Sequence, residues 1–131
     1  MQKLVSEHRT VADVMTATVH VASPSTPLRA LANLIQDNRV SAVPIVDQSG
    51  VPVGVVSASD LLFKERRPEV ESAADVMTSP AITVGLETPI AEAARVMHEH
   101  DVRRLVVVEA RGRIAGILTR SDLLQVFLRN G

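Results

Sequence analysis

The sequence contains no cysteine, no tryptophan and no tyrosine, and only two of its 131 residues are phenylalanine. The absence of cysteine excludes disulfide bonds, thiol catalysis and zinc sites built on thiolates. So few aromatic rings cannot form a stacking platform for single-stranded nucleic acid. The net charge is only −1, which argues against broad electrostatic binding to nucleic acid. We therefore expect no nucleic-acid partner.

Hydrophobic stretches are short throughout the chain. The run Leu105–Val108 is typical of the longest, far below the roughly 18 residues that a transmembrane helix requires. The beginning of the sequence, MQKLVSEHRT, has no hydrophobic region of the signal-peptide type. These features predict no membrane span, no export signal and a cytoplasmic location. The composition, with 46% hydrophobic and 22% charged residues, is that of an ordinary globular protein.

The most informative feature of the sequence is an internal repeat. The string ADVMT occurs at Ala12–Thr16 and again at Ala74–Thr78, an offset of 62 residues. The same offset aligns residues 12–62 with 74–124 without a gap, and 16 of the 51 aligned pairs are identical. Chance similarity between apolar segments does not give an ungapped register of this length. The chain is therefore interpreted as a tandem duplication.

Both copies predict the same order of elements. A short β-prone stretch is followed by Thr-Pro as helix cap and first helical position, and then by apolar residues at helical spacing. A glycine turn joins the next two apolar runs as a hairpin, after which a last helix begins. The expected strands are Val19–Val21, Val43–Val46 and Val53–Val56 in the first copy and Ile82–Val84, Leu105–Val108 and Ile114–Leu118 in the second, and the last helices are expected to begin near Ser57 and Thr119.

The fold class follows from these elements and from their size. A repeat of about 60 residues is only marginally stable alone, so the two copies are expected to bury their apolar faces against each other. We predict an α/β (α+β) fold, with two β-α-β-β-α repeats packed as a pseudo-twofold module. The predicted domains are residues 10–66 and 72–128. Corresponding positions of the two copies should line two related clefts at the junction.

The most polar segment of each copy is the turn from the second hairpin strand into the last helix. In each copy two hydroxyls and a carboxylate fall within four residues; they are Ser57, Ser59 and Asp60 in the first copy and Thr119, Ser121 and Asp122 in the second. A helix N-terminus favours an anion, and a carboxylate there can accept hydrogen bonds from a cis-diol such as a ribose. The same residue types are also ordinary helix caps. The pattern leaves both interpretations open.

An arginine pair distinguishes the two copies. Before the central strand the second copy has Arg103 and Arg104, where the first copy has Ser41 and Ala42. A guanidinium group suits phosphate because it donates paired, charge-assisted hydrogen bonds. The alternative is a solvated pair of surface arginines, with no ligand.

Together these motifs resemble a tandem pair of CBS domains, a Bateman module. The resemblance covers about residues 10–128 and rests on the two ADVMT strings, the Thr-Pro helix starts, the strands VSAVPIVD and VRRLVVVE, and the paired turns GVVSASD and GILTRSD. Such pairs bind adenosine nucleotides in two clefts between the repeats and regulate an attached or partner protein. VRRLVVVE followed by GILTRSDLL also resembles repeats of the AMP-activated kinase γ subunit.

The resemblance implies a role for each candidate residue. Asp122 and Asp60 match the acid that holds the ribose hydroxyls, and the neighbouring hydroxyls, Thr119, Ser121, Ser57 and Ser59, lie near ribose and phosphate. Arg103 and Arg104 match the basic pair that meets phosphate. The segments near Thr83 and Val84, and Val19 to Val21, match the backbone and apolar side chains that hold the adenine. Ser41 and Ala42 depart from this pattern, although the arginines could reach across a shared cleft.

The function predicted from the sequence is a non-catalytic, energy-sensing regulatory module that binds AMP, ADP or ATP. No nucleophile, base or metal-ligand set is apparent, so neither an enzyme, a catalytic cofactor nor a metal site is expected. The alternatives are a structural or dimerisation module without a physiological nucleotide, and a binder of S-adenosylmethionine or NAD. The expected partners are a second copy of the chain and an effector protein or attached C-terminal domain, since LLQVFLRNG resembles CBS pairs that continue into a small domain such as BON.

Overall fold

The computed structural model describes residues 9–17, 19–62 and 69–130. The chain divides into two compact units. The middle unit is His20–Ala81, and the terminal unit combines Met1–Val19 with Ile82–Gly131. Each unit joins helices to a β-sheet, which confirms the predicted α+β class. The units differ from the contiguous repeats 10–66 and 72–128, whose boundaries stay a prediction.

The middle unit contains a two-stranded antiparallel sheet and three described helices. Its elements are α3 (Leu28–Asn38), β1 (Ala42–Val46), β2 (Pro52–Ser57), α4 (Ala58–Leu62) and α5 (Ala73–Val76). The predicted strand Val19–Val21 is wrong, because the pairing with β1 is a single parallel bridge at Ala22. The Ala22 N–H donates to the Pro44 carbonyl at 3.1 Å, and a turn closed by the Thr26 N–H and the Ser23 carbonyl follows at once. This turn ends the extended segment.

The terminal unit is built from equivalent elements with one more strand. They are α2 (Val11–Val14), β3 (Thr83–Gly85), α6 (Ile90–His100), β4 (Arg104–Val108), β5 (Ile114–Thr119) and α7 (Arg120–Asn130). The strand order is β3-β4-β5, with β3 parallel and β5 antiparallel to β4. The strand predicted at Ile82–Val84 is therefore present, shifted by one residue. Both hairpins and both last helices lie where the sequence predicts them.

The long helices begin differently from the prediction. Pro27 and Pro89 occupy the N-cap positions of α3 and α6, and neither helix has a side-chain cap. The preceding threonines bond to the backbone of the turn before the helix instead. Thr26 Oγ1 accepts a hydrogen bond from the Ser23 N–H at 3.0 Å, and Thr88 Oγ1 accepts one from the Gly85 N–H at 3.1 Å. Thr-Pro thus marks a turn followed by a helix. The threonine hydroxyl accepts a hydrogen bond within that turn and does not cap the first turn of the helix.

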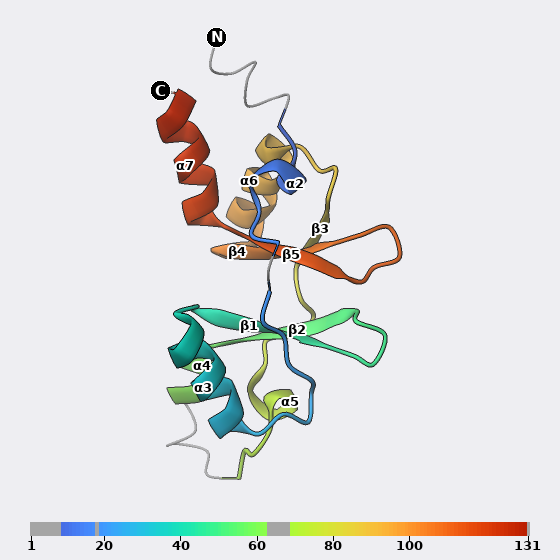
Figure 1. Ribbon diagram of the computed structural model, residues 1–131, viewed down its shortest axis with the longest axis vertical. Coiled ribbons are helices and arrows are strands. Elements are labelled where there is room, and N and C mark those ends of the chain that lie inside the picture. Colours follow the sequence, from blue (N-terminus) through green and yellow to red (C-terminus); the bar gives the residue numbers. More distant parts are fainter. Residues whose placement is uncertain (1–8, 18, 63–68, 131) are drawn as a thin grey trace. The chain divides into compact units, whose positions relative to one another are not determined.

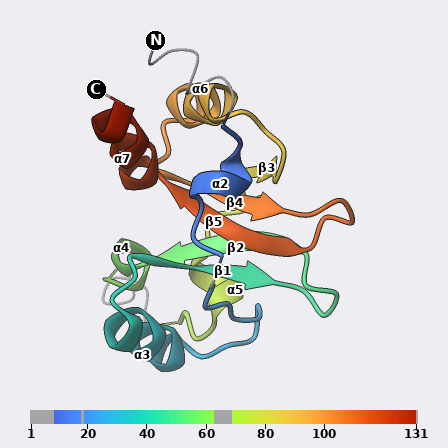
Figure 2. The ribbon, with the colours of Figure 1, turned by 45° about the horizontal axis from the view of Figure 1, so that its top comes forward.

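Each unit has its own hydrophobic core on one face of its sheet. In Figures 1 and 2 the helices α2, α6 and α7 lie together on one side of β3-β4-β5, and α3, α4 and α5 lie together on one side of β1-β2. Side chains from these helices and from alternate strand positions fill the space between them. The buried members are Val11, Val84, Ala93, Met97, Leu105, Val107 and Leu118 in the terminal unit, and Leu28, Leu31, Val43, Ile45, Val56, Val70 and Ala73 in the middle unit.

The two ADVMT segments are exchanged between the repeats. The first opens repeat one along the chain but packs in the terminal unit with most of repeat two, where the Val11 N–H donates to the Thr88 carbonyl at 2.8 Å. The second packs in the middle unit, where the Ala73 N–H donates to the Thr26 carbonyl at 2.9 Å. These two bonds are equivalent under the 62-residue offset. The core of each unit is therefore completed by the ADVMT segment that opens the other repeat.

Candidate functional site

The 119–122 turn joins the end of β5 to the start of α7. The Thr119 N–H donates to Asp122 Oδ2 at 2.8 Å, and the Asp122 N–H donates to Thr119 Oγ1 at 3.1 Å. This reciprocal pair is a capping box, which satisfies donors that the first helical turn leaves free. Both residues are half-buried, whereas Ser121 between them is exposed. The capping interpretation that the sequence left open is thus realised in the structure.

The 57–60 turn of the middle unit repeats this arrangement between β2 and α4. The Ser57 N–H and hydroxyl both donate to Asp60 Oδ2, at 2.7 and 3.0 Å, and the Asp60 N–H donates to Ser57 Oγ at 3.3 Å. The Ser59 hydroxyl lies 3.0 Å from that of Ser57. Within the described residues, every side-chain hydrogen bond accepted by these two aspartates falls on Oδ2. Oδ1 of each carboxylate accepts no hydrogen bond from these residues.

The predicted basic pair lies beside the 119–122 turn. Arg104 is the cross-strand partner of Thr119, and the Arg120 N–H donates to the Arg103 carbonyl at 2.8 Å. Arg103 and Arg120 are exposed, and Arg104 is half-buried. The equivalent positions of the middle unit are Ser41, Ala42 and Ala58. Sequence reasoning missed Arg120, which adds a positive charge beside this turn, although the 62-residue offset already aligned it with the uncharged Ala58.

The residues that were predicted to hold adenine differ in burial and in the unit to which they belong. Thr83 is exposed on β3 and is paired with Val106, two positions along β4 from Arg104. The side chain of Val84 is buried in the core of the terminal unit, so its backbone is the part left for a ligand. Val19 belongs to the terminal unit and is half-buried, whereas Val21 belongs to the middle unit and is 38% exposed.

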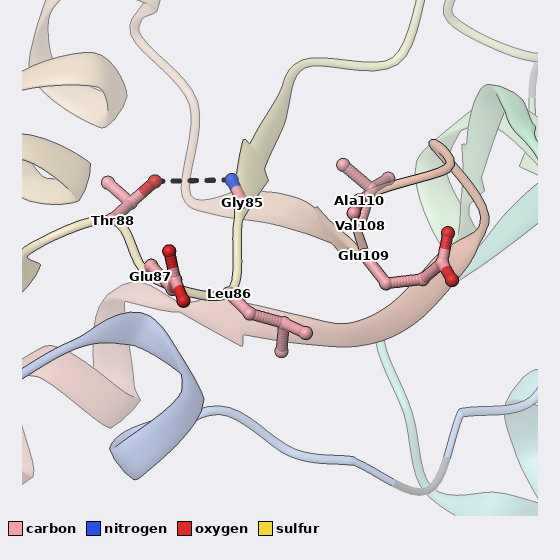
Figure 3. Close-up of a pocket in the computed structure, with 7 residues that line it drawn as sticks. All are labelled: Gly85, Leu86, Glu87, Thr88, Val108, Glu109 and Ala110. Atoms are coloured by element: carbon pink, nitrogen blue, oxygen red, sulfur yellow. Dashed lines mark hydrogen bonds between the residues drawn. The ribbon is translucent and has the colours of Figure 1, made fainter.

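A cavity of about 490 Å³ lies at the Val108 end of β4, opposite the end that carries Arg104. It is lined by Gly85, Leu86, Glu87, Thr88, Val108, Glu109 and Ala110 (Figure 3). Four residues along a strand separate Val108 from Arg104, roughly 13 Å at about 3.3 Å per residue. The lining includes none of the predicted ligand residues. This cavity is therefore distinct from the end of the sheet that carries the arginines and the 119–122 turn.

One of the two carboxylates at that cavity, Glu109, forms part of a tight turn. Glu109 Oε1 accepts hydrogen bonds from the N–H groups of Arg111 and Arg113, at 2.7 and 3.1 Å. The carboxylate also pairs with the Arg113 guanidinium at 3.2 Å. The backbone N–H of Arg113, followed by its side chain, lowers the pKa of Glu109 below its ordinary value. Its carboxylate is thus engaged in closing the β4–β5 hairpin.

Among residues 9–17, 19–62 and 69–130, no group of three histidine, aspartate or glutamate side chains is placed to hold a metal ion. Over the same ranges, no helix combines the length and the apolar character needed to cross a bilayer.

Comparison with known families identifies this architecture. The family model for the CBS domain matches residues 11–66 and 73–129, and the chain therefore belongs to the CBS domain family. This confirms the resemblance on which the sequence assignment rested.

Individual relatives agree with the family assignment. "Uncharacterized protein MK0525" of Methanopyrus kandleri is 31% identical over 120 residues, covering 88% of this chain and 61% of that protein. The chloroplastic CBS domain-containing protein CBSX2 of Arabidopsis thaliana is 31% identical over 152 residues, covering 92% of this chain and 64% of that protein. This chain thus spans less than two thirds of the length of either relative.

Solved structures extend the comparison. CBSX2 in complex with AMP has a TM-score of 0.81 at 35% identity and covers 92% of this chain and 96% of that one. The CBS domain pair of MJ0100, solved with 5′-methylthioadenosine and S-adenosyl-L-methionine, has a TM-score of 0.86 at 22% identity. It covers 94% of this chain and 98% of that one. At that identity, the MJ0100 structure supports the fold alone.

Proposed function

We propose that this chain is a non-catalytic regulatory module that binds an adenosine nucleotide, with AMP, ADP and ATP as the candidate ligands. The observation that carries the proposal is the carboxylate of the 119–122 turn, held by Oδ2 in a cap and open at Oδ1, with arginines beside it. The 57–60 turn repeats the carboxylate. The 35% identity to CBSX2, which was solved with AMP, supports this choice of ligand.

Each group has a defined task in the proposed complex. Asp122 Oδ1 accepts hydrogen bonds from the ribose hydroxyls while Oδ2 keeps the helix cap intact. The hydroxyls of Thr119 and Ser121 contact ribose and phosphate, and Arg103 and Arg104 neutralise phosphate through charge-assisted hydrogen bonds. The segment at Thr83 and Val84 holds the adenine. Asp60, Ser57 and Ser59 take the corresponding tasks in a second site, and Val19 and Val21 are the remaining candidates for contact with adenine.

A ligand panel tests this function directly. Dye-based thermal unfolding is suitable, because the chain has no Trp or Tyr for intrinsic fluorescence. A nucleotide at a hundred times its Kd adds about 2.7 kcal/mol to the free energy of unfolding. For a chain of this size, this corresponds to a rise of several degrees in Tm. A rise with AMP, ADP or ATP supports the proposal, and a rise with S-adenosylmethionine or NAD alone redirects it within the adenosine class. No rise with any of them contradicts it.

Arg104→Ala is expected to weaken AMP binding about tenfold or more and to leave adenosine binding nearly unchanged. A hydrogen bond from a charged group contributes on the order of 1.5–3 kcal/mol, and adenosine has no phosphate to receive it. Calorimetric titration of both ligands measures the difference. Arg113→Ala is the matched control, because Arg113 pairs with Glu109 beyond the other end of the strand and should affect neither ligand. Equal losses for AMP and adenosine would exclude a phosphate role for Arg104.

A scaffold function is the second candidate, and the exposed apolar residues of α7 favour it. Leu124, Phe127 and Leu128 are exposed although they are large and apolar. We propose that the chain forms a homodimer, that it acts on an effector protein or an attached domain, and that its location is the cytoplasm. Sedimentation of the wild type and of Phe127→Ser tests the dimer. A monomeric wild type would remove the scaffold candidate.

A further inference from the structure

Helix α7 is attached to its unit by few apolar contacts. Val126 is 2% exposed and is the one buried residue among the described side chains of this helix. Leu123 packs partly against the core, whereas Leu124, Phe127 and Leu128 are exposed. Helices of this length are marginal without tertiary packing, so a small apolar contact leaves much of their stability to the cap. The cap at the 119–122 turn, worth about 1 kcal/mol, is therefore one of the few contributions that hold α7 in order.

The proposed ligand uses the same junction. Asp122 Oδ2 fixes the cap by accepting from the Thr119 N–H, and Oδ1 of the same carboxylate would receive the ribose. The first residue of the helix, Arg120, is bonded through its N–H to the carbonyl of Arg103. A ligand held by Asp122 thus requires the carboxylate in its capping position. A frayed N-terminus of α7 would move the ribose acceptor away.

We infer that nucleotide binding and the order of α7 are coupled, so that α7 is the element that reports occupancy of the site. The inference rests on the proposed nucleotide function and identifies α7 as the helix whose order changes when the nucleotide binds. Coupling between two sites is reciprocal: a ligand that orders α7 must bind less tightly when α7 is loosened by other means. Because of this reciprocity, the inference can be tested in two directions, by adding the nucleotide and by loosening the helix.

Hydrogen exchange with mass spectrometry on the full chain tests the first direction. Saturating AMP is expected to slow exchange of the α7 amides about fivefold or more, with a smaller change in α6 of the same unit. Asp75→Asn is the matched control variant. Ser72 and Asp75 form a reciprocal cap of the same kind on α5, which belongs to the middle unit, so AMP should still protect α7 in this variant.

Two buried valines, one in each unit, test the reverse direction. Val126→Ala loosens the core-facing side of α7 and is expected to lower AMP affinity two- to tenfold, although Val126 lies outside the proposed site. Val70→Ala removes the same atoms from the core of the middle unit, and it is expected to leave AMP affinity unchanged. If Val126→Ala does not fold, the exchange experiment on the wild type decides alone.

The outcomes separate this inference from the function on which it rests. AMP binding with protection of α7, and with weaker binding by Val126→Ala, supports the coupling. AMP binding by calorimetry without any change in α7 exchange overturns the coupling and leaves the nucleotide function intact. No AMP binding overturns both.

Discussion

Asp122→Ala is expected to weaken AMP binding 100-fold or more. Two ribose hydroxyls lose a charged acceptor, and each such hydrogen bond contributes on the order of 1.5–3 kcal/mol. The cap on α7 is lost at the same time, because Asp122 Oδ2 accepts from the Thr119 N–H at 2.8 Å. Loss of the cap alone costs about 1 kcal/mol of stability. Calorimetric titration of the folded variant measures the loss of affinity.

Two control variants separate the cap from the ligand contact. Asp122→Asn keeps an oxygen for the Thr119 N–H but removes the negative charge, so we expect its stability to stay near that of the wild type while AMP binding falls about tenfold. Asp13→Ala removes a cap of the same type from α2 and is expected to leave AMP binding unchanged. Asp122→Ala binding AMP as tightly as the wild type would reduce the 119–122 turn to a helix cap.

Gly116→Ala has the largest expected effect on stability, about 3 kcal/mol. A Cβ at this position would lie 2.6 Å from Met15 Sδ and 2.7 Å from the carbonyl oxygen of Thr16. The sulfur belongs to a flexible side chain, but the oxygen is backbone. It belongs to a residue that exchanges both N–H···O bonds with Ile117 of β5, at 2.9 and 3.0 Å. Overpacking of this kind costs about 1–3 kcal/mol, and the fixed backbone places this site at the upper end.

The matched control for this substitution is Gly85→Ala. A Cβ there would lie 3.8 Å from Thr88 Oγ1, which is ordinary van der Waals contact. Urea unfolding followed by circular dichroism should therefore show a much smaller loss for Gly85→Ala than for Gly116→Ala. Gly54→Ala should repeat the large loss, because its Cβ would lie 2.7 Å from Met77 Sδ and 2.9 Å from the Thr78 carbonyl oxygen. Equal, small losses at all three glycines would show that the ADVMT segments do not pack closely against β5 and β2.

Local signals in the sequence predict much of this fold. The turns of the two hairpins follow from Gly50 and Gly112, which have φ values of 84° and 86° that other residues rarely adopt. The helices follow from apolar spacing, as at Leu28 and Leu31 on the buried face of α3. The duplication supplies every element twice, so a prediction from one copy checks the other.

Long-range pairing is the part that the sequence does not reveal. The exchange of the ADVMT segments depends on bonds such as that from the Val11 N–H to the Thr88 carbonyl, which join residues far apart in the chain. Neither composition nor periodicity encodes such a partner. The strand expected at Val19–Val21 was wrong for a similar reason. An extended segment forms a strand only where several consecutive residues pair with a neighbouring strand.

The sequence predicts which residues form the candidate site, but it does not decide whether they cap a helix, bind a ligand or do both. Serine or threonine followed three residues later by aspartate is both a capping box and a set of ligand groups, because both tasks need a carboxylate at a helix N-terminus. The structure realises the cap at Asp60 and Asp122 and leaves one oxygen of each for the second task. The ligand role of these aspartates therefore stays a proposal.

The most direct test of the central claim compares AMP with its 2′-deoxy analogue by calorimetric titration of the wild-type chain. The account requires Asp122 Oδ1 to accept hydrogen bonds from both ribose hydroxyls. Losing one of them should weaken binding about tenfold or more, since a hydrogen bond to a charged acceptor contributes on the order of 1.5–3 kcal/mol. Tight binding of AMP with clearly weaker binding of 2′-deoxy-AMP is the predicted result. Equal affinity for the two nucleotides would contradict the account and leave the aspartates as helix caps alone.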